Sequence, residues 1–295
     1  MIDFYIKKNL IKFGALIITY YYILIKSNMN TKKTSGGFPL IISALAILIC
    51  LFIGIFIFKG ILGSASNFEG GDADKGHPLN ILGTMYKGGF IVPILIGFLL
   101  TVITFAIERF ITIMKANGSG QTDKFVSKIK SLISAHDFEG AIAACDKQKG
   151  SLANVVHEGI IKYQYVMTDS SMDKEAKVIS IQKALEEATS LELPMLSKNM
   201  VVISTMASIG TLAGLIGTVV GMIRAFAALS AAGAPDTSAL ATGISEALVN
   251  TLVGILTSAF AIIFYNYFSN RIDQITYAMD EAGFSIIHEF QSTGK

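Results

Sequence analysis

One run of the sequence, residues 237–270, contains a single charged residue, Glu246. At ~1.5 Å per residue this run spans about 50 Å as a helix, enough to cross a bilayer and project beyond it. A carboxylate at membrane depth costs on the order of 2.5–3.5 kcal/mol, so such residues usually have a function. The sequence therefore predicts a membrane helix in which Glu246 is the first candidate for a functional residue.

Helical periodicity puts Glu246 on a stripe of polar and small residues, opposite an apolar face that suits lipid or a packed partner. The alternative is a carboxylate that snorkels to the interface or is held by one static hydrogen bond. The stripe comprises Thr242, Gly243, Glu246, Asn250, Val253 and Thr257, and the apolar face comprises Leu240, Leu248, Ile255 and Ile262.

Composition indicates an integral membrane protein with one sizeable aqueous portion. Hydrophobic residues make up 52% and charged residues 16% of the chain, against about 25% charged residues in ordinary soluble domains. The net charge of +2 gives no reason to expect a nucleic acid partner. Cys50 and Cys145 are interpreted as packing residues and not as a disulfide or a metal pair.

Four runs are long and apolar enough to span a membrane, residues 38–58, 88–107, 199–223 and 237–270. Residues 13–25 are short for a span and are not followed by a signal-peptide cleavage site. Residues 1–28 are interpreted either as a translation-start artefact or as a poorly anchored amphipathic extension. Apolar residues at helical spacing predict a solvated helical bundle over residues 115–198. The expected fold is all-α: a multi-pass transmembrane protein whose long helices extend into a cytoplasmic helical bundle.

Basic residues set the expected orientation. Lys32 and Lys33 precede the first span, whereas the connection 225–236 contains no Lys or Arg. This pattern places both termini and residues 115–198 in the cytoplasm. Residues 59–87 and the connection 225–236 then lie outside. Residues 59–87 carry three lysines, so they fit the excess of basic residues on the cytoplasmic side less well.

The signatures of common enzymes are incomplete. His157-Glu158 and His288-Glu289 begin like zinc-protease helices, but neither has a second His four residues after the first. A phosphate loop and a Gly-x-Ser-x-Gly elbow are also missing from the sequence. The sequence therefore gives no support for an enzyme, a metal site or a cofactor.

The third apolar run favours close helix contact. Small residues four positions apart let two backbones approach, and a mildly polar stripe lies beside them, so this face can pack a helix or line a cavity. Arg224 directly follows the run, and its guanidinium is expected to reach water or headgroups at the outer end. The small residues are Gly210, Gly214, Gly217 and Gly221, and the stripe includes Thr211 and Thr218.

Two motifs in register resemble a known family. Residues 214–223, GLIGTVVGMI, and residues 243–254, GISEALVNTLVG, closely resemble the last two transmembrane helices of the ExbB/TolQ/MotA proton-channel family. The ExbB/TolQ branch matches best, and the resemblance extends over roughly residues 88–270. The added span at residues 38–58 departs from the three-span pattern of ExbB.

The resemblance implies a proton path. Glu246 stands at the position of the family's pore glutamate, and Thr218 and Thr251 stand at those of its pore-lining threonines. Asn250 and Thr211 join this predicted path, and Gly254 joins the four glycines as a packing residue. Thr251 lies about 140° from Glu246 around one helix, so both can face one pore only when neighbouring subunits share it.

The resemblance further implies a subunit of an inner-membrane complex that couples the proton gradient to TonB-dependent transport across the outer membrane. The implied partners are further copies of the chain in a homopentamer, a single-span protein of the ExbD/TolR type and a TonB-like protein. A TolQ-like role in envelope maintenance is the first alternative, and a motility stator is the second. A non-conducting structural scaffold is the alternative from a different class.

These predictions divide the chain into eight segments. They are an N-terminal extension (1–37), an additional transmembrane helix (38–58), a periplasmic segment (59–87), the first family transmembrane helix (88–114), a cytoplasmic helical region (115–198), a transmembrane helix with a Gly/Thr face (199–234), the transmembrane helix with Glu246 (237–270) and a cytoplasmic tail (271–295).

Overall fold

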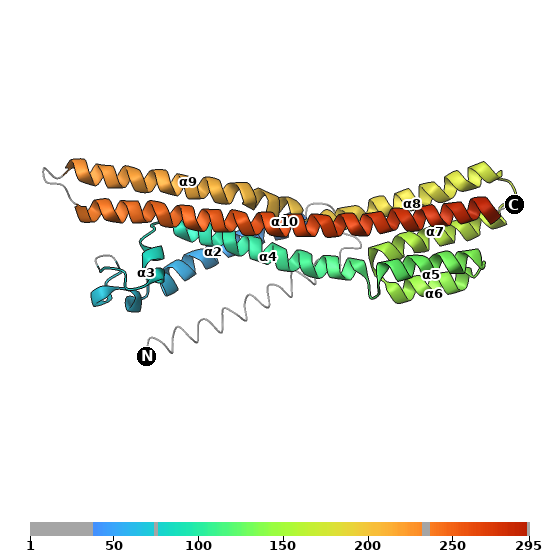
Figure 1. The fold of residues 1–295 in the computed structure, drawn as a ribbon, viewed down its shortest axis with the longest axis horizontal. Coiled ribbons are helices and arrows are strands. Elements are labelled where there is room, and N and C mark those ends of the chain that lie inside the picture. Colours follow the sequence, from blue (N-terminus) through green and yellow to red (C-terminus); the bar gives the residue numbers. More distant parts are fainter. Residues whose placement is uncertain (1–37, 74–75, 232–236, 294–295) are drawn as a thin grey trace. The chain divides into compact units, whose positions relative to one another are not determined.

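The computed structural model describes residues 38–73, 76–231 and 237–293, so the predictions for residues 1–37 lie outside it. Regular secondary structure in the described ranges is helical (Figure 1). Four helical stretches there are long and apolar enough, by length and composition, to cross a membrane. They are Ser43–Leu62, Val92–Ser134, Lys174–Ser230 and Thr237–Ser292. The prediction of an all-α protein with four candidate membrane spans is confirmed.

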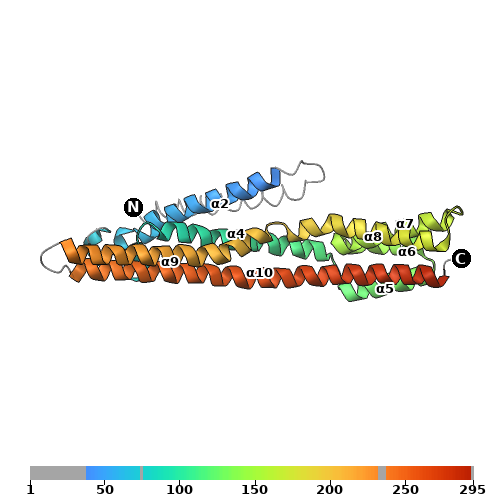
Figure 2. The same ribbon diagram turned by 90° about the horizontal axis from the view of Figure 1, so that it is seen from above.

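The described part of the chain divides into two compact units, and the first combines its residues up to Glu108 with Val201–Phe264. Helices α9 and α10 lie side by side in it as an antiparallel hairpin (Figures 1 and 2). The helices that contribute to this unit are α2 (Phe38–Ile57), α4 (Val92–Asn117), α9 (Met200–Ala231) and α10 (Thr237–Thr293).

The additional span, α2, packs closely on α4 through two glycines. A Cβ atom on Gly54 would lie 2.4 Å from the carbonyl oxygen of Pro93, and one on Gly97 would lie 2.7 Å from a methyl group of Leu51. The side chains of Cys50 and Thr104 meet at the same contact, 3.6 Å apart. Most of the exposed residues of α2 are large and apolar, among them Leu45, Leu48 and Phe52, which suits a lipid environment.

A compact cap connects α2 to α4. It contains η2 (Phe58–Leu62), η3 (Ala65–Asn67), η4 (Glu69–Gly71) and α3 (Ile81–Tyr86). The buried Asn67 amide donates to the carbonyls of Ile61 and Leu62 at 2.8 and 2.9 Å and accepts from Asn80 at 3.0 Å. Residues 59–87, which the sequence predicts only as a periplasmic segment, are thus built around a buried asparagine.

The second unit combines Arg109–Met200 with the chain from Tyr265 onward. Its helices are α5 (Thr122–Ser134), α6 (Phe138–Gln148), α7 (Gly150–Thr168), α8 (Lys174–Ser197) and the last part of α10. Asp137 and Asp173 cap α6 and α8 by accepting backbone N–H groups at 2.8 and 2.7 Å. This is the helical bundle that the periodic pattern over residues 115–198 predicts.

Two features bind this bundle together beyond its apolar stripes. Tyr163 lies between Phe138 and Phe290, with ring centroids 4.9 Å away on either side. Buried Arg109 donates to the carbonyls of Met195 and Leu196 at 3.2 Å each. Because the last carbonyls of a helix lack partners within it, the guanidinium satisfies the C-terminal end of α8.

The segment 271–295, predicted as a tail, is helical as far as Thr293. It continues α10, and Ile286 and Phe290 are fully buried in the bundle. Apolar residues three and four positions apart, such as Ile275, Met279 and Ala282, give this part of α10 a continuous buried stripe. The described part of the predicted tail is therefore a core helix of the second unit.

Cys145 is buried in α6, and the cysteines Cys50 and Cys145 are both free, as predicted. Burial, with a smaller contribution from the Asp146 charge, raises the pKa of the Cys145 thiol to about 12. The thiolate is the reactive form, and its fraction at neutral pH is then roughly a thousandfold below that of an ordinary cysteine. We expect a maleimide to label Cys145 only after unfolding, while a cysteine replacing exposed Ser171 is labelled in the native protein. Rapid native labelling at Cys145, detected by mass spectrometry, would show that this helix opens.

Candidate functional site

The α9–α10 hairpin determines which predicted residues meet. Residues equally far from the connection lie opposite one another, so Gly214 contacts Gly254 and Gly221 contacts Ala247. A Cβ atom on Gly217 would lie 2.4 Å from the Cβ atom of Asn250. All five predicted packing glycines lie at this contact within one chain, namely Gly210, Gly214, Gly217, Gly221 and Gly254.

Glu246 is buried on α10 and forms an ion pair with Arg224 of α9. Arg224 Nη1 donates to Glu246 Oε1 at 2.7 Å. The side chain of Glu246 is 8% exposed, whereas that of Arg224 is 50% exposed. The carboxylate is therefore enclosed in the chain, and the guanidinium links it to the surface.

The turn that leads into α4 closes the other side of Glu246. Gly89 has φ +80°, and a Cβ atom there would lie 2.1 Å from Glu246 Oε1. Next to it, Asn250 donates from its side chain to the carbonyl of Gly88 at 2.9 Å. Only glycine at position 89 leaves room for the carboxylate. Gly88 and Gly89 therefore pack directly against the Asn250 and Glu246 side chains of α10.

Thr218 and Thr251 form a second polar contact between α9 and α10. Their hydroxyl oxygens are hydrogen-bonded to each other, and the Thr218 hydroxyl also donates to the carbonyl of Gly214 at 3.2 Å. Thr211 is exposed on α9, and its hydroxyl donates to the Ser208 carbonyl at 3.0 Å. The five predicted path residues thus fall into three places: Glu246 and Asn250 at the α4 turn, the threonine pair, and Thr211 on the surface.

The polar stripe of α10 faces into its own chain. Gly243, Glu246, Asn250, Val253 and Thr257 are buried, and Thr242 is the exposed member of the predicted stripe. The face that was expected to suit lipid is exposed at Leu248, Ile255 and Ile262. Two buried oxygens near the contact, Asn250 Oδ1 and Ser258 Oγ, have no hydrogen-bond partner among the described residues.

Sequence reasoning did not predict that Arg224 pairs with Glu246, or that Gly89 contacts the carboxylate. The antiparallel hairpin contains a signal for the first of these contacts. Arg224 precedes the connection and Glu246 follows it at similar distances, so the two belong to facing turns. Only the folded cap shows the second contact, because Gly89 is far from Glu246 in sequence.

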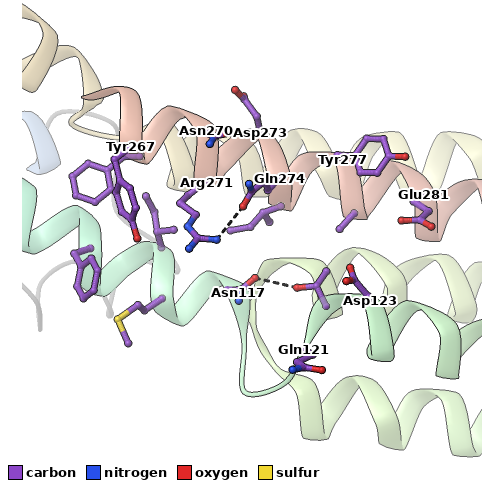
Figure 3. A pocket seen from close by; sticks show the side chains of 17 residues that line it. Asn117, Gln121, Asp123, Tyr267, Asn270, Arg271, Asp273, Gln274, Tyr277 and Glu281 are labelled. Atoms are coloured by element: carbon purple, nitrogen blue, oxygen red, sulfur yellow. Dashed lines mark hydrogen bonds between the residues drawn. The ribbon is translucent and has the colours of Figure 1, made fainter. Parts of the chain in front are cut away.

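The second unit contains a pocket of about 930 Å³ between α10 and the adjoining parts of α4 and α5 (Figure 3). Asp123, Asp273 and Glu281 line it together with Arg271, which donates to Gln274 at 3.0 Å. The lining thus mixes both signs of charge, and none of the five predicted path residues belongs to it. The candidate site is therefore the Glu246 region of the first unit.

Comparison with protein families identifies this region. Residues 148–281, which include Arg224, Glu246 and both threonines of the pair, match the model of the MotA/TolQ/ExbB proton channel family. This region of the chain belongs to the family. Its members are channels and not enzymes, in agreement with the incomplete enzyme signatures of the sequence.

Several curated relatives of the MotA/TolQ/ExbB family are similar over part of their length. The chain is 30% identical over 121 residues to a Synechocystis protein named ExbB-like 3, covering 40% of this chain and 58% of that protein. It is 35% identical over 101 residues to the Tol-Pal system protein TolQ of Haemophilus influenzae, covering 34% and 44%. An ExbB homolog of Methanothermobacter thermautotrophicus is 26% identical over 204 residues, covering 66% of each chain. The chain thus spans about half the length of the first two relatives.

Proposed function

We propose that this chain is the proton-conducting subunit of an inner-membrane energy-transducing complex. The proposal rests on the environment of Glu246, the single charged residue of the 237–270 run. Its carboxylate is buried and accepts a charge-assisted hydrogen bond from Arg224. Ionisable residues inside membrane helices commonly serve ion or proton pathways. Glu246 is proposed as the group on this chain that accepts and releases the proton.

The threonine pair is proposed to continue the path. Hydroxyl groups can donate and accept at once, so Thr218 and Thr251 can pass a proton or hold a water molecule between them. Asn250 and Thr211 are proposed to contribute polar groups beside them. Because the two α10 positions Glu246 and Thr251 point in different directions, the rest of the path is assigned to surfaces supplied by other subunits.

The proposed assembly is a homopentamer around a single-span partner of the ExbD/TolR type. In the proposed ExbB-like role, this assembly works with a TonB-like protein to drive uptake across the outer membrane. Relatives named ExbB and TolQ both occur among the matches, and ExbB is the slightly more frequent name. The TolQ-like role is therefore the second candidate.

The proposed orientation puts the second unit and both termini in the cytoplasm. It is tested with the cysteine at position 171, since native Cys145 is buried. A membrane-impermeant maleimide added to sealed cells should leave this cysteine unlabelled and should label it after the membrane is permeabilised. Labelling in sealed cells would contradict the orientation.

A deletion strain separates the candidate roles. Under the proposal, loss of the gene abolishes TonB-dependent uptake, and the tagged chain copurifies with a single-span partner. A strain with normal uptake but a detergent-sensitive envelope would favour the TolQ-like role. Normal uptake, envelope and motility, with no copurifying single-span protein, would favour a structural scaffold.

A further inference from the structure

The ion pair at Glu246 is a feature that the proposed proton path does not by itself require. A buried carboxylate can be stabilised by hydroxyl or amide groups, yet here it is paired with a full positive charge. Arg224 also lies over the ring of Phe90, with the guanidinium carbon 5.2 Å from the ring centroid. The guanidinium is thus fixed at two points, one on α10 and one on the turn before α4.

The geometry leaves Glu246 little freedom while this pair is intact. Gly89 fills the space on one side of the carboxylate, and the Asn250 side chain binds the neighbouring carbonyl of Gly88. The turn formed by residues 88–90 is fixed to the cap by contacts at the end of α3. The rings of Tyr86 and Phe58 stack with centroids 4.6 Å apart, and the Lys87 ammonium lies over the ring of Phe68. Among the described residues, Arg224 is the cation that contacts Glu246.

We propose that Arg224 is a positioning residue of the proton path, which holds the Glu246 carboxylate in a closed position against residues 88–90. In this closed position Glu246 is shielded by the turn, and it exchanges protons with the rest of the path only when the pair opens. The role of Arg224 in the proton path rests on the proposed channel function. The closed position itself is tested without measuring conduction.

The pair is suited to opening because its two members differ in exposure. Half of the Arg224 side chain is already exposed, so the guanidinium can leave the carboxylate without becoming a buried, unpaired charge. Opening must break one charge-assisted hydrogen bond and the contact with Phe90. Loss of the guanidinium should raise the population of the open position on the order of tenfold.

The experiment measures how fast Glu246 reacts with a hydrophobic carbodiimide in native membranes that contain the full chain and its partners. Modified Glu246 is quantified by mass spectrometry of the corresponding peptide, and the exposed Glu281 of the same helix serves as the internal reference. Arg224→Gln should accelerate modification of Glu246 on the order of tenfold, because the carboxyl is then free to leave the turn. Arg224→Lys keeps the positive charge but loses the planar group over Phe90, so its rate should rise by no more than about threefold over the wild type.

Two further variants keep the test independent of folding defects. Arg271→Gln makes the same substitution at an exposed arginine of α10 and should leave the Glu246 rate unchanged. Phe90→Ala keeps both charges but removes the aromatic support of the guanidinium, so it should give an intermediate acceleration. An unchanged rate in Arg224→Gln, or equal acceleration in the Gln and Lys variants, would overturn the proposal.

This readout separates the inference from the channel proposal. If Glu246 were not on a proton path, proton flux would survive its neutralisation, but the carbodiimide rates would still report the closed position. If Arg224 did not position Glu246, the rates would be equal in all variants while flux still depended on Glu246. Failure of the channel proposal therefore shows in the proton flux, and failure of the positioning proposal shows in the carbodiimide rates.

Discussion

Replacing Glu246 by Gln is expected to abolish proton-coupled uptake in cells while leaving the protein folded and assembled. Gln has nearly the same shape, and its amide oxygen can still accept from Arg224 Nη1, but it does not titrate. Arg224 is not stranded as a buried charge, because half of its side chain is exposed. The measurement is uptake of a TonB-dependent substrate in the deletion strain, with assembly followed on native gels.

Glu281→Gln is the matched control for this prediction. It makes the same chemical change on the same helix at an exposed position of the second unit, and uptake should stay at the wild-type level. Glu246→Asp tests geometry, since it keeps a titrating group one methylene further from Arg224 and should retain partial uptake. Wild-type uptake in the Glu246→Gln strain would remove Glu246 from the proposed path.

Replacing Gly217 by Ala is expected to destabilise the first unit by roughly 1–3 kcal/mol, the usual cost of overpacking a close contact. The new methyl group would lie 2.4 Å from Asn250 Cβ and 2.6 Å from Asn250 Cγ. Either α9 and α10 move apart, or Asn250 loses its hydrogen bond to Gly88. The measurement is the thermal unfolding midpoint of the purified protein, together with the proton flux that remains.

The control is Gly283→Ala, also on α10. A Cβ atom at this position would meet Leu185 at 3.5 Å, an ordinary contact, and alanine favours the helix more than glycine does. Its midpoint should therefore equal or exceed that of the wild type. Equal midpoints for the two variants would mean that the hairpin is looser than the glycine contacts indicate.

The membrane-spanning architecture could be predicted from sequence because it follows from composition over long segments. Runs of about 20 apolar residues have few alternatives to a buried or membrane-spanning helix, and the four runs correspond to the four helical stretches. The same periodic reasoning identified the bundle over residues 115–198. It does not reach the full extent of α10, because residues 271–295 are predicted only as a tail whereas the helix continues to Thr293.

The candidate site was harder to predict, because a helical wheel treats each helix alone. The stripe that contains Glu246 and Asn250 is polar and small, and such a stripe suits a pore and a close helix contact equally well. The structure shows the second arrangement within one chain, with Gly217 against Asn250. The contact with Gly89 depends on the folded cap, for which sequence periodicity offers no signal.

The central claim, that Glu246 carries protons, is tested most directly by proton flux into proteoliposomes that contain the chain with its copurified single-span partner. Flux is driven by a potassium diffusion potential and followed with a pH-sensitive dye trapped inside. The account predicts measurable flux for the wild type and for Glu281→Gln, and flux at the level of protein-free vesicles for Glu246→Gln. Equal flux in the wild type and Glu246→Gln would contradict it.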